Sequence, residues 1–534
     1  MSQVIFEPAE EYERTYRMLH LDKVNQYFQR LVQTSGIDIE ENRRTVQAYD
    51  AYTANVAELK KKRNWLRFWR VLMCISIVLI PVVILKTTPR IQQLLKDIET
   101  ADQKADELLE QARQQMAPLC RLFTDRDCLA LVEETLPLLD FADRLSSEQE
   151  TDMCVNYDFG RDNTWEQSSL DVLAGRFNEN PFLFERQLVH TMGTETYHGY
   201  KTISWTESYI DSEGKRRTRT QTETLHATVV KPKPYYTTQV VLHYCAQGGP
   251  ELSFSRDPGH VEQMSERELE RHVKKGAKKL QRLTDRAVQA GDDFTTMSNE
   301  EFEVLFDATD RDHEVQFRTL FTPLAQTNIV ALLRSKAGYG DDFSMIKRRR
   351  TNHIFSQHSQ QRMLVLAAAE YFSHSYDLIL KNFVEKNAAF FRDVYFDFAP
   401  LWSIPIYQER PVHALKPLPP LSSIYSMREC EALANSANAA YLVHPNTKTP
   451  SMIKTIPLGS KDGADEICVA AYSYDIAKRV DMVSVFGGDG RFHTVAVHWD
   501  EYLPLEARNH FHVSTAQTQK TVVAQRNGLL MYTT

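Results

Sequence analysis

The feature that most constrains this chain is a run of fifteen uncharged residues near its N-terminus. Residues Val71 to Leu85 read VLMCISIVLIPVVIL. Fifteen residues are fewer than the ~20 that a helix needs to cross ~30 Å of hydrocarbon. Counted from Trp65, the segment reaches 21 residues, and Trp65 and Trp69 have the placement of aromatic side chains at a membrane interface. The sequence therefore predicts a transmembrane helix over residues 65–86.

Two other interpretations of the segment are weaker. A buried core helix is disfavoured because the adjoining stretch from Lys60 to Arg70 is strongly basic. A cleaved signal peptide is disfavoured because a long polar stretch precedes the segment and no small-residue cleavage site follows it. Pro81 removes one backbone hydrogen bond, which membrane helices tolerate.

The basic residues beside the segment predict its orientation. Six lie on the N-terminal side, namely Lys60, Lys61, Lys62, Arg63, Arg67 and Arg70. Three lie on the C-terminal side, namely Lys86, Arg90 and Lys96. Because lysine and arginine are enriched in cytoplasmic flanks, we expect a single-pass protein of the cell membrane, with a cytoplasmic N-terminus and an extracytoplasmic C-terminal domain.

Length and charge limit the class of protein. The chain has 534 residues, of which 42% are hydrophobic and 25% charged, and this balance predicts two or three globular units. The net charge of −8 excludes a general nucleic-acid binder, which needs a basic surface to neutralise phosphates. We therefore expect no nucleic-acid partner.

Helical periodicity surrounds the apolar segment. Residues 1–64 are predicted to be helical, because Tyr49, Tyr52, Val56 and Leu59 fall on one helix face. Residues 90–150 are predicted to form a helical stalk. Its apolar seam consists of Leu94, Ile98, Ala101, Ala105, Leu108 and Ala112. The seam fits either a coiled coil that joins copies into a homo-oligomer or a helix packed on its own chain.

The remaining sequence alternates between strand and helix patterns. A long hairpin is expected around Asp211 to Gly214, and its polar faces near the turn predict that it projects into solvent. A second hairpin is expected around the turn Gly487 to Gly490. The segment EVQFRTLF is expected to be a strand, and a long core helix is expected from Gln360 to Phe391. The fold class is thus α+β, with a mixed domain over residues 151–410, a proline-rich linker, and a β-rich module over residues 424–534.

Two stretches resemble a known family. Thr206 to Val230 and Asn299 to Leu333 are similar to segments of a bacterial family of membrane-anchored proteins known only as a domain of unknown function (number 3137). The resemblance covers about a third of the chain, and the long extension after Arg410 departs from it. It implies a bacterial membrane protein and brings no catalytic residues.

Motifs that would carry chemistry are weak, and we expect no cofactor and no metal. Gly487 to Gly490 lacks the phosphate-loop pattern and is interpreted as a turn. Metal ligation is disfavoured for two groups of histidines, namely His493, His498, His510 and His512, and His353 with His358. A calcium loop is disfavoured for Asp307, Asp310 and Asp312, because the required glycine and glutamate are absent.

Seven cysteines are present, and none forms a zinc-binding pair. Cys74 lies in the apolar segment, and the other six fit either disulfides or free buried thiols. These six are Cys120, Cys128, Cys154, Cys245, Cys430 and Cys468.

Two functions follow as hypotheses, and the catalytic residues of the second are unknown. The first is a membrane-anchored, non-enzymatic binding or scaffold module with a protein partner. The second is a membrane-bound hydrolase whose site is formed from distant segments, which predicts a deep pocket that brings His, Asp or Ser side chains together.

Overall fold

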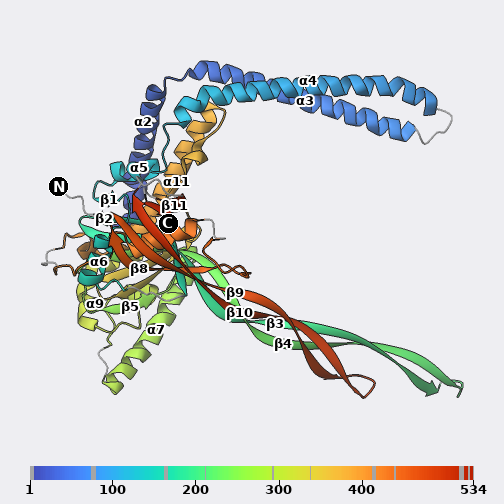
Figure 1. Ribbon diagram of the computed structural model, residues 1–534. Coiled ribbons are helices and arrows are strands. Elements are labelled where there is room, and N and C mark those ends of the chain that lie inside the picture. The colour runs from blue at the N-terminus through green and yellow to red at the C-terminus, as the bar shows by residue number, and fades with distance from the viewer. Residues whose placement is uncertain are drawn as a thin grey trace. The chain divides into compact units, whose positions relative to one another are not determined.

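The computed structural model describes most of the chain (Figure 1). The described ranges are 5–73, 80–160, 166–210, 212–291, 294–336, 338–411, 416–421, 423–437, 441–515, 522–526 and 529–532. The chain divides into two compact units. One contains Met1–Glu7, Asp140–Leu364 and Ala399–Thr534, and the other contains Pro8–Leu139 and Val365–Phe398. Helices and antiparallel sheets together confirm the α+β class.

The second unit is built of helices. They are α1 (Pro8–Glu11), the π-helix η1 (Tyr12–Tyr16), α2 (Arg17–Ser35), α3 (Ile39–Met73), α4 (Ile80–Cys120), α5 (Asp127–Thr135), η5 (Ala368–Tyr371) and α11 (Tyr376–Trp402). Gly36 ends α2 in the left-handed conformation, with φ of 63°. Around α2, α4 and α11 lies an aromatic-rich core that includes Phe28, Phe123 and Phe383.

Helices α3 and α4 run antiparallel along one another (Figure 1). The buried residues of α4 include five at seven-residue steps, namely Ile91, Ile98, Ala105, Ala112 and Leu119. Such spacing gives a continuous coiled-coil seam. Near the base of the pair, the buried side chain of Asn42 donates to the carbonyl oxygen of His374 and accepts from the amide of Tyr376. In this structure the seam of α4 packs on α3 of the same chain, and the coiled coil between copies stays a prediction.

The structure describes the helix predicted over residues 65–86 only in part. Helix α3 ends at Met73, α4 begins at Ile80, and residues 74–79 lie outside the described ranges. Within the ranges that the structure describes, no helix combines the length and the apolar character needed to cross a bilayer. The predicted stalk over residues 90–150 is helical only in part, because it also contains strand β1.

The first unit contains a seven-stranded antiparallel sheet. Its strands are β1 (Leu139–Phe141), β2 (Gln167–Phe177), β3 (Asn180–Ile210), β4 (Arg216–Cys245), β5 (Ser253–Arg256), β6 (Phe343–Arg348) and β7 (Thr351–Ser356). The strand order is β1-β2-β3-β4-β7-β6-β5. Strands β3 and β4 pair from Phe182↔Tyr244 to Ile210↔Arg216, and this confirms the first predicted hairpin.

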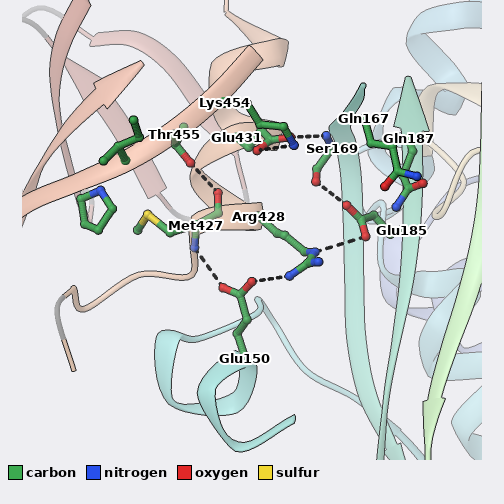
Figure 2. Close-up of a pocket in the computed structure, with 12 residues that line it drawn as sticks. Glu150, Gln167, Ser169, Glu185, Gln187, Met427, Arg428, Glu431, Lys454 and Thr455 are labelled. Carbon is green, nitrogen blue, oxygen red and sulfur yellow. Dashed lines mark hydrogen bonds and ion pairs between the residues drawn. The ribbon is translucent and has the colours of Figure 1, made fainter. Parts of the chain in front are cut away.

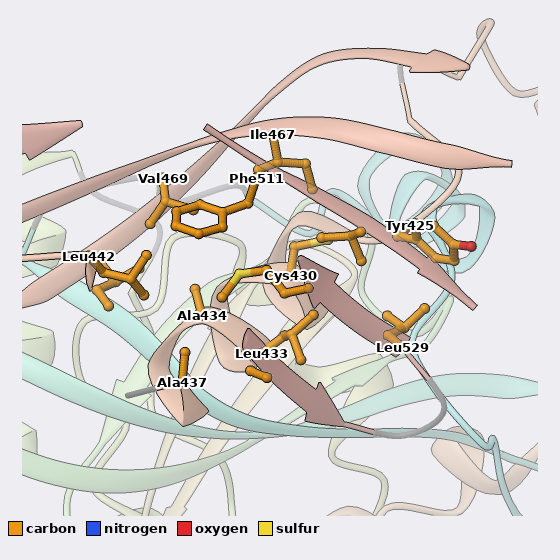
Figure 3. Packing of buried hydrophobic residues seen from close by; sticks show 14 of the residues in the cluster. Tyr425, Cys430, Leu433, Ala434, Ala437, Leu442, Ile467, Val469, Phe511 and Leu529 are labelled. Atoms are coloured by element: carbon orange, nitrogen blue, oxygen red, sulfur yellow. The ribbon is translucent and has the colours of Figure 1, made fainter. Parts of the chain in front are cut away.

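A five-stranded antiparallel sheet completes this unit. It consists of β8 (Met452–Lys461), β9 (Ala464–Phe486), β10 (Phe492–Thr515), β11 (Val522–Arg526) and β12 (Leu529–Tyr532), in the order β11-β12-β10-β9-β8. Helix α12 (Met427–Ser436) packs on it, with Cys430 and Leu433 set among Ile467, Val469 and Phe511 (Figure 3). The predicted ranges 151–410 and 424–534 thus both contribute to one compact unit.

The two long hairpins pack on each other (Figure 1). Ile203, Leu225 and Ala227 of β3 and β4 are buried against Val495 and Val497 of β10. The side chains of the first hairpin nearest its turn are exposed, as predicted, but its middle is covered by the second hairpin. A pair of strands alone is marginally stable in water, so this mutual cover explains how both hairpins extend so far.

Shorter elements complete the first unit. They are α6 (Ser147–Tyr157), η3 (Val261–Gln263), α7 (Glu266–Ala290), α8 (Glu300–Phe306), α9 (Glu314–Leu320), α10 (Pro323–Arg334), η4 (Gln357–Ser359) and η6 (Pro405–Gln408). Two sequence predictions are wrong here. EVQFRTLF forms α9 and not a strand, because a helix buries Phe317, Leu320 and Phe321 on one side. The long helix begins at Tyr376 instead of Gln360.

Candidate functional site

A polar cavity of about 110 Å³ lies where α6, β2, β3, α12 and β8 meet (Figure 2). Its charged and hydroxyl-bearing residues include Glu150, Ser169, Glu185, Arg428, Glu431 and Lys454. They come from segments far apart in the sequence, as a hydrolase site would require. The cavity is small beside the roughly 300–1,000 Å³ of pockets that enclose drug-sized molecules.

Arg428 is the central cation of the cavity. Its Nη1 lies 2.5 Å from Oε1 of Glu150, and its Nε lies 3.3 Å from Oε2 of Glu185. Burial alone would lower the pKa of Arg428, but the two carboxylates outweigh it and hold that pKa above its ordinary value. Burial would raise the pKa of Glu185, yet Arg428 and hydrogen bonds to the carboxylate hold that pKa well below its usual range. Both groups are therefore charged at neutral pH.

The Glu431 carboxyl has a pKa near neutrality. Burial raises its pKa to about 7, against the opposing effect of Lys454. The Nζ atom of Lys454 lies 3.1 Å from Oε1 of Glu431, and the amide of Ser169 donates to the same oxygen at 2.6 Å. A carboxyl with such a pKa has the acidity that general acid–base catalysis uses.

The Ser169 hydroxyl in the cavity is not arranged as a nucleophile. Ser169 donates its proton to Glu185, and the other oxygen of Glu185 lies 3.2 Å from Nε2 of His243. Nδ1 of His243 in turn lies 2.6 Å from Nδ1 of His353, and burial holds the pKa of His353 well below its ordinary value. A serine nucleophile needs the imidazole beside its hydroxyl, whereas here the carboxylate stands between them. The geometry therefore gives no support to acyl transfer at Ser169.

Polar side chains beside the cavity also join the two sheets. Ser168 of β2 donates to the carbonyl oxygen of Ile453 and accepts from its amide, at 2.9 and 3.1 Å. Arg526 of β11 bonds Asp171 of β2 and Glu429 of α12. Because polar side chains link β2 to both β8 and β11 of the C-terminal sheet, we interpret the cavity as a structural network of paired charges.

The glycine turn is confirmed as a turn. Gly490 has a φ of 77°, and its amide donates to the carbonyl oxygen of Gly487. The amide of Gly488 donates to the Glu223 carboxylate of β4 at 2.6 Å. The turn thus attaches the second hairpin to the first.

The histidines that the sequence singled out are not brought together. His493 bonds Asp489 at 2.9 Å, His498 is exposed on the opposite face of β10, and His510 lies 3.8 Å from Glu466. His512 is also on β10. Among the residues that the structure describes, no three His, Cys, Asp or Glu side chains are placed to share a metal ion.

His358 has a different environment from that of His353. Its Nδ1 lies 2.6 Å from Asp342, and its ring stacks on Tyr339 with centroids 3.7 Å apart. The two histidines therefore have separate partners and do not form one site.

The aspartates of the candidate calcium loop bind backbone instead. Asp312 accepts from the amide of Ser253 at 2.7 Å, and Asp310 accepts from the amide of Ser255 at 2.8 Å. Asp307 ends α8 in the left-handed conformation. Ser253 and Ser255 belong to β5, the edge strand of the larger sheet, so two of the three carboxylates satisfy amides that the edge leaves unpaired.

The six described cysteines are free thiols, and Cys74 lies outside the described ranges. Burial raises the pKa of Cys245 and of Cys430, which makes both thiols poor nucleophiles at neutral pH. Of the two interpretations of the cysteine count, the structure shows free thiols.

A second candidate site is the end of the α3–α4 pair, where the apolar segment lies. On α3, the side chains of Trp65 and Phe68 are each 62% exposed, and Trp69 packs beside both, with ring centroids 5.8 and 6.3 Å away. A cluster of large exposed aromatic side chains marks a surface that another phase or molecule covers.

Sequence reasoning identified the apolar segment, as a single span, and missed the polar cavity. The signal for the cavity was a carboxylate, Glu185, directly after the apolar run PFLF of a strand. No family model, curated protein or solved structure matches this chain. The resemblance to the domain of unknown function (number 3137) therefore stays a prediction.

Proposed function

We propose that this chain is a membrane-anchored, non-enzymatic binding module, and that its lipid contact is the apolar end of the α3–α4 pair. The observation that carries the proposal is that two antiparallel helices hold the described parts of the apolar segment, residues 65–73 and 80–85, at one end of a coiled coil. Lys61, Lys62 and Arg67 flank that end as exposed cations, which suits the anionic surface of a membrane.

The length of the apolar end fits one leaflet. From Trp65 to Met73 the helix rises roughly 12 Å at 1.5 Å per residue, and half of a ~30 Å hydrocarbon core is roughly 15 Å. Trp65 then lies at the depth where tryptophan is enriched, next to the headgroups. The proposal is therefore a hairpin that enters the bilayer from one side.

Entry as a hairpin has a consequence for topology. Because α3 and α4 are antiparallel, the chain returns to the side from which it entered. The N-terminal residues and the sheet unit then share one side of the membrane. This differs from the single-pass arrangement that the lysine and arginine counts predicted.

Binding of a protein partner is supported by the outer face of the β9–β10 hairpin. One face of this hairpin lies opposite the buried valines and carries Val480, Met482, Phe486 and Phe492. The two strands share this face because Phe486 pairs with Phe492. Met482 is 69% exposed and Phe492 73% exposed. An amphipathic hairpin would carry polar residues there, so the apolar row supports a partner surface. The alternative of a hydrolase lacks such support, because Ser169 faces a carboxylate.

Flotation with lipid vesicles tests the anchor. Full-length protein is diluted from detergent into vesicles of phosphatidylcholine and phosphatidylglycerol and centrifuged through a density gradient. We expect the wild type to float. The variant W65S/F68S/W69S should show at least a tenfold lower membrane partition, because each large apolar side chain contributes roughly 1.5–3 kcal/mol when it leaves water.

The matched control removes three exposed apolar side chains elsewhere, in the variant Y200S/Y209S/I210S of the β3–β4 hairpin. It should float as the wild type does. A wild-type protein that stays with the vesicle-free fraction would contradict the proposed anchor, and so would equal losses in the two variants.

A further inference from the structure

Helix α7 concentrates positive charge that the proposed anchor does not use. From Arg271 to Arg286 it carries one carboxylate, Asp285, and seven cations, namely Arg271, Lys274, Lys275, Lys278, Lys279, Arg282 and Arg286. All seven side chains are exposed. The chain as a whole has a net charge of −8, so this helix opposes the sign of the protein that carries it.

Part of this charge lines a groove between α7 and α8 of about 580 Å³. The helices approach closely because Gly276 has no side chain, and a methyl group there would collide with Val304. Leu280 and Val304 are buried beneath the groove, and Leu283 is a partly exposed apolar side chain in its lining. In the described part of the chain, the carboxylate of the groove is Asp307, 3.9 Å from Lys279.

Four cations form a row along the groove. The row consists of Lys275, Lys279, Arg282 and Arg286. Their spacing of four, three and four residues places them on one helix face over roughly 16 Å. Like charges at this spacing repel each other and destabilise a helix. An anionic ligand along the row would remove that repulsion.

We propose that this groove, the α7 groove, binds an acidic amphipathic peptide segment of a partner protein. Carboxylates of the peptide would meet the cation row, and a leucine-like side chain would cover the partly exposed Leu283. This is recognition of a helix in a groove, with charge complementarity that sets orientation.

Two other polyanions fit the α7 groove less well. Among the described residues that line it, the one ring is that of His272, and no Phe, Tyr or Trp side chain offers a larger surface on which nucleic-acid bases could stack. A bilayer surface is flat, and the apolar side chains Leu269, Leu280 and Ala287 of α7 are buried within the protein, so the helix cannot insert them into lipid as an interfacial helix does.

The test is a binding titration with full-length protein in detergent micelles. The probe is a fluorescein-labelled helical peptide with leucine on one face and glutamate elsewhere, and binding to empty micelles is subtracted. The groove variant K275E/K279E/R282E should bind at least tenfold more weakly than the wild type. The matched control R267E/R271E/K274E makes the same charge change on α7 away from the groove, and should bind as the wild type does.

Circular dichroism should show equal helix content in all three proteins, since the substituted side chains are exposed. Absence of peptide binding, or equal weakening in the two variants, would overturn the proposal. A sequence-shuffled peptide of the same composition should bind weakly. Tighter binding of a thymidine oligonucleotide or of phosphatidylserine vesicles, lost in the groove variant, would overturn the peptide assignment in favour of that ligand.

Discussion

Lys60 of α3 and Asp102 of α4 form an ion pair, with Nζ 3.2 Å from the carboxylate, although 42 residues separate them along the chain. The pair is solvent-exposed and contributes little to stability. Its value is geometric, because it reports the register in which the two helices run antiparallel. The direction of the chain therefore reverses between the end of α3 and the start of α4, within the apolar segment.

The first prediction concerns topology. If the α3–α4 end enters the membrane as a hairpin, single cysteines at Gln33→Cys in α2 and Glu213→Cys in the β3–β4 turn will lie on the same side of it. Both positions are exposed. An impermeant maleimide should label both in intact cells, or label both only after lysis.

The wild-type chain gives the background of its own thiols, and fractionation of the same cells reports whether the protein is membrane-bound at all. Opposite labelling of the two positions in a membrane-bound protein would contradict the hairpin. A protein absent from the membrane fraction would contradict the anchor itself.

Local patterns predicted the sheets better than the helices. The two-residue alternation of Val483, Val485, Val495 and Val497 and the glycine turn between them were sufficient to identify the second hairpin. The prediction for EVQFRTLF was wrong because its short apolar run fits both the two-residue period of a strand and the 3.6-residue period of a helix. A helix buries Phe317, Leu320 and Phe321 on one side, against neighbouring elements.

The path of the apolar segment and the polar cavity could not be derived in this way. Length and hydropathy alone do not distinguish one straight span from the end of a hairpin. That distinction rests on heptad contacts of α4 with α3. The cavity is formed by three segments that are distant in the sequence and carry Glu150, Glu185 and Arg428. Only the tertiary fold brings these two helices and one strand together, so no rule of residue spacing predicts the site.

The second prediction tests the paired charges of the cavity. Arg428→Met leaves Glu150 and Glu185 buried without their cation, and breaking a buried pair in this way costs ~3–5 kcal/mol of unfolding free energy. Urea denaturation followed by fluorescence would measure it. Arg410→Met is the matched control, because Arg410 is an exposed partner of Glu179 at 3.7 Å.

The double variant R428M/E185Q provides the diagnostic step. Neutralising Glu185 removes one of the two stranded charges, so this variant should be more stable than Arg428→Met alone. Equal stability of Arg428→Met and the wild type would mean that the network does not hold the sheets together.

The third prediction concerns the dependence of stability on pH. Burial raises the pKa of Glu431 from 4.5 to about 7, so the folded protein holds this proton more tightly than the unfolded chain does. The carboxyl therefore stabilises the fold below pH 4.5, and the contribution is lost as the pH rises through 7. Glu431→Gln removes this titration.

Relative to Glu431→Gln, the wild type should lose about 3 kcal/mol of unfolding free energy between pH 4.5 and pH 8, at ~1.4 kcal/mol for each pKa unit. Glu185 has the opposite sign, because its lowered pKa favours the fold at higher pH. Both proteins contain Glu185, so its effect cancels in the difference. Parallel stability curves for the two proteins would contradict the raised pKa.

The fourth prediction tests the contact between the two long hairpins. Gly199 of β3 lies so close to the carbonyl oxygen of Ala496 in β10 that an added methyl group would collide with it. Backbone cannot yield as a flexible side chain can, so Gly199→Ala should separate the hairpins locally. Their buried cluster around Val497 would then be exposed to water.

Limited proteolysis with chymotrypsin measures this separation, since Tyr197 and Trp205 are packed against that cluster in the wild type. Cleavage at these residues should become faster in Gly199→Ala. The control is Gly193→Ala, where the added methyl group would meet the ring of Tyr235, a side chain that can move. Unchanged cleavage in Gly199→Ala would mean that the hairpins are already apart in solution, and that the exposed row around Phe492 is not the only apolar face available to a partner.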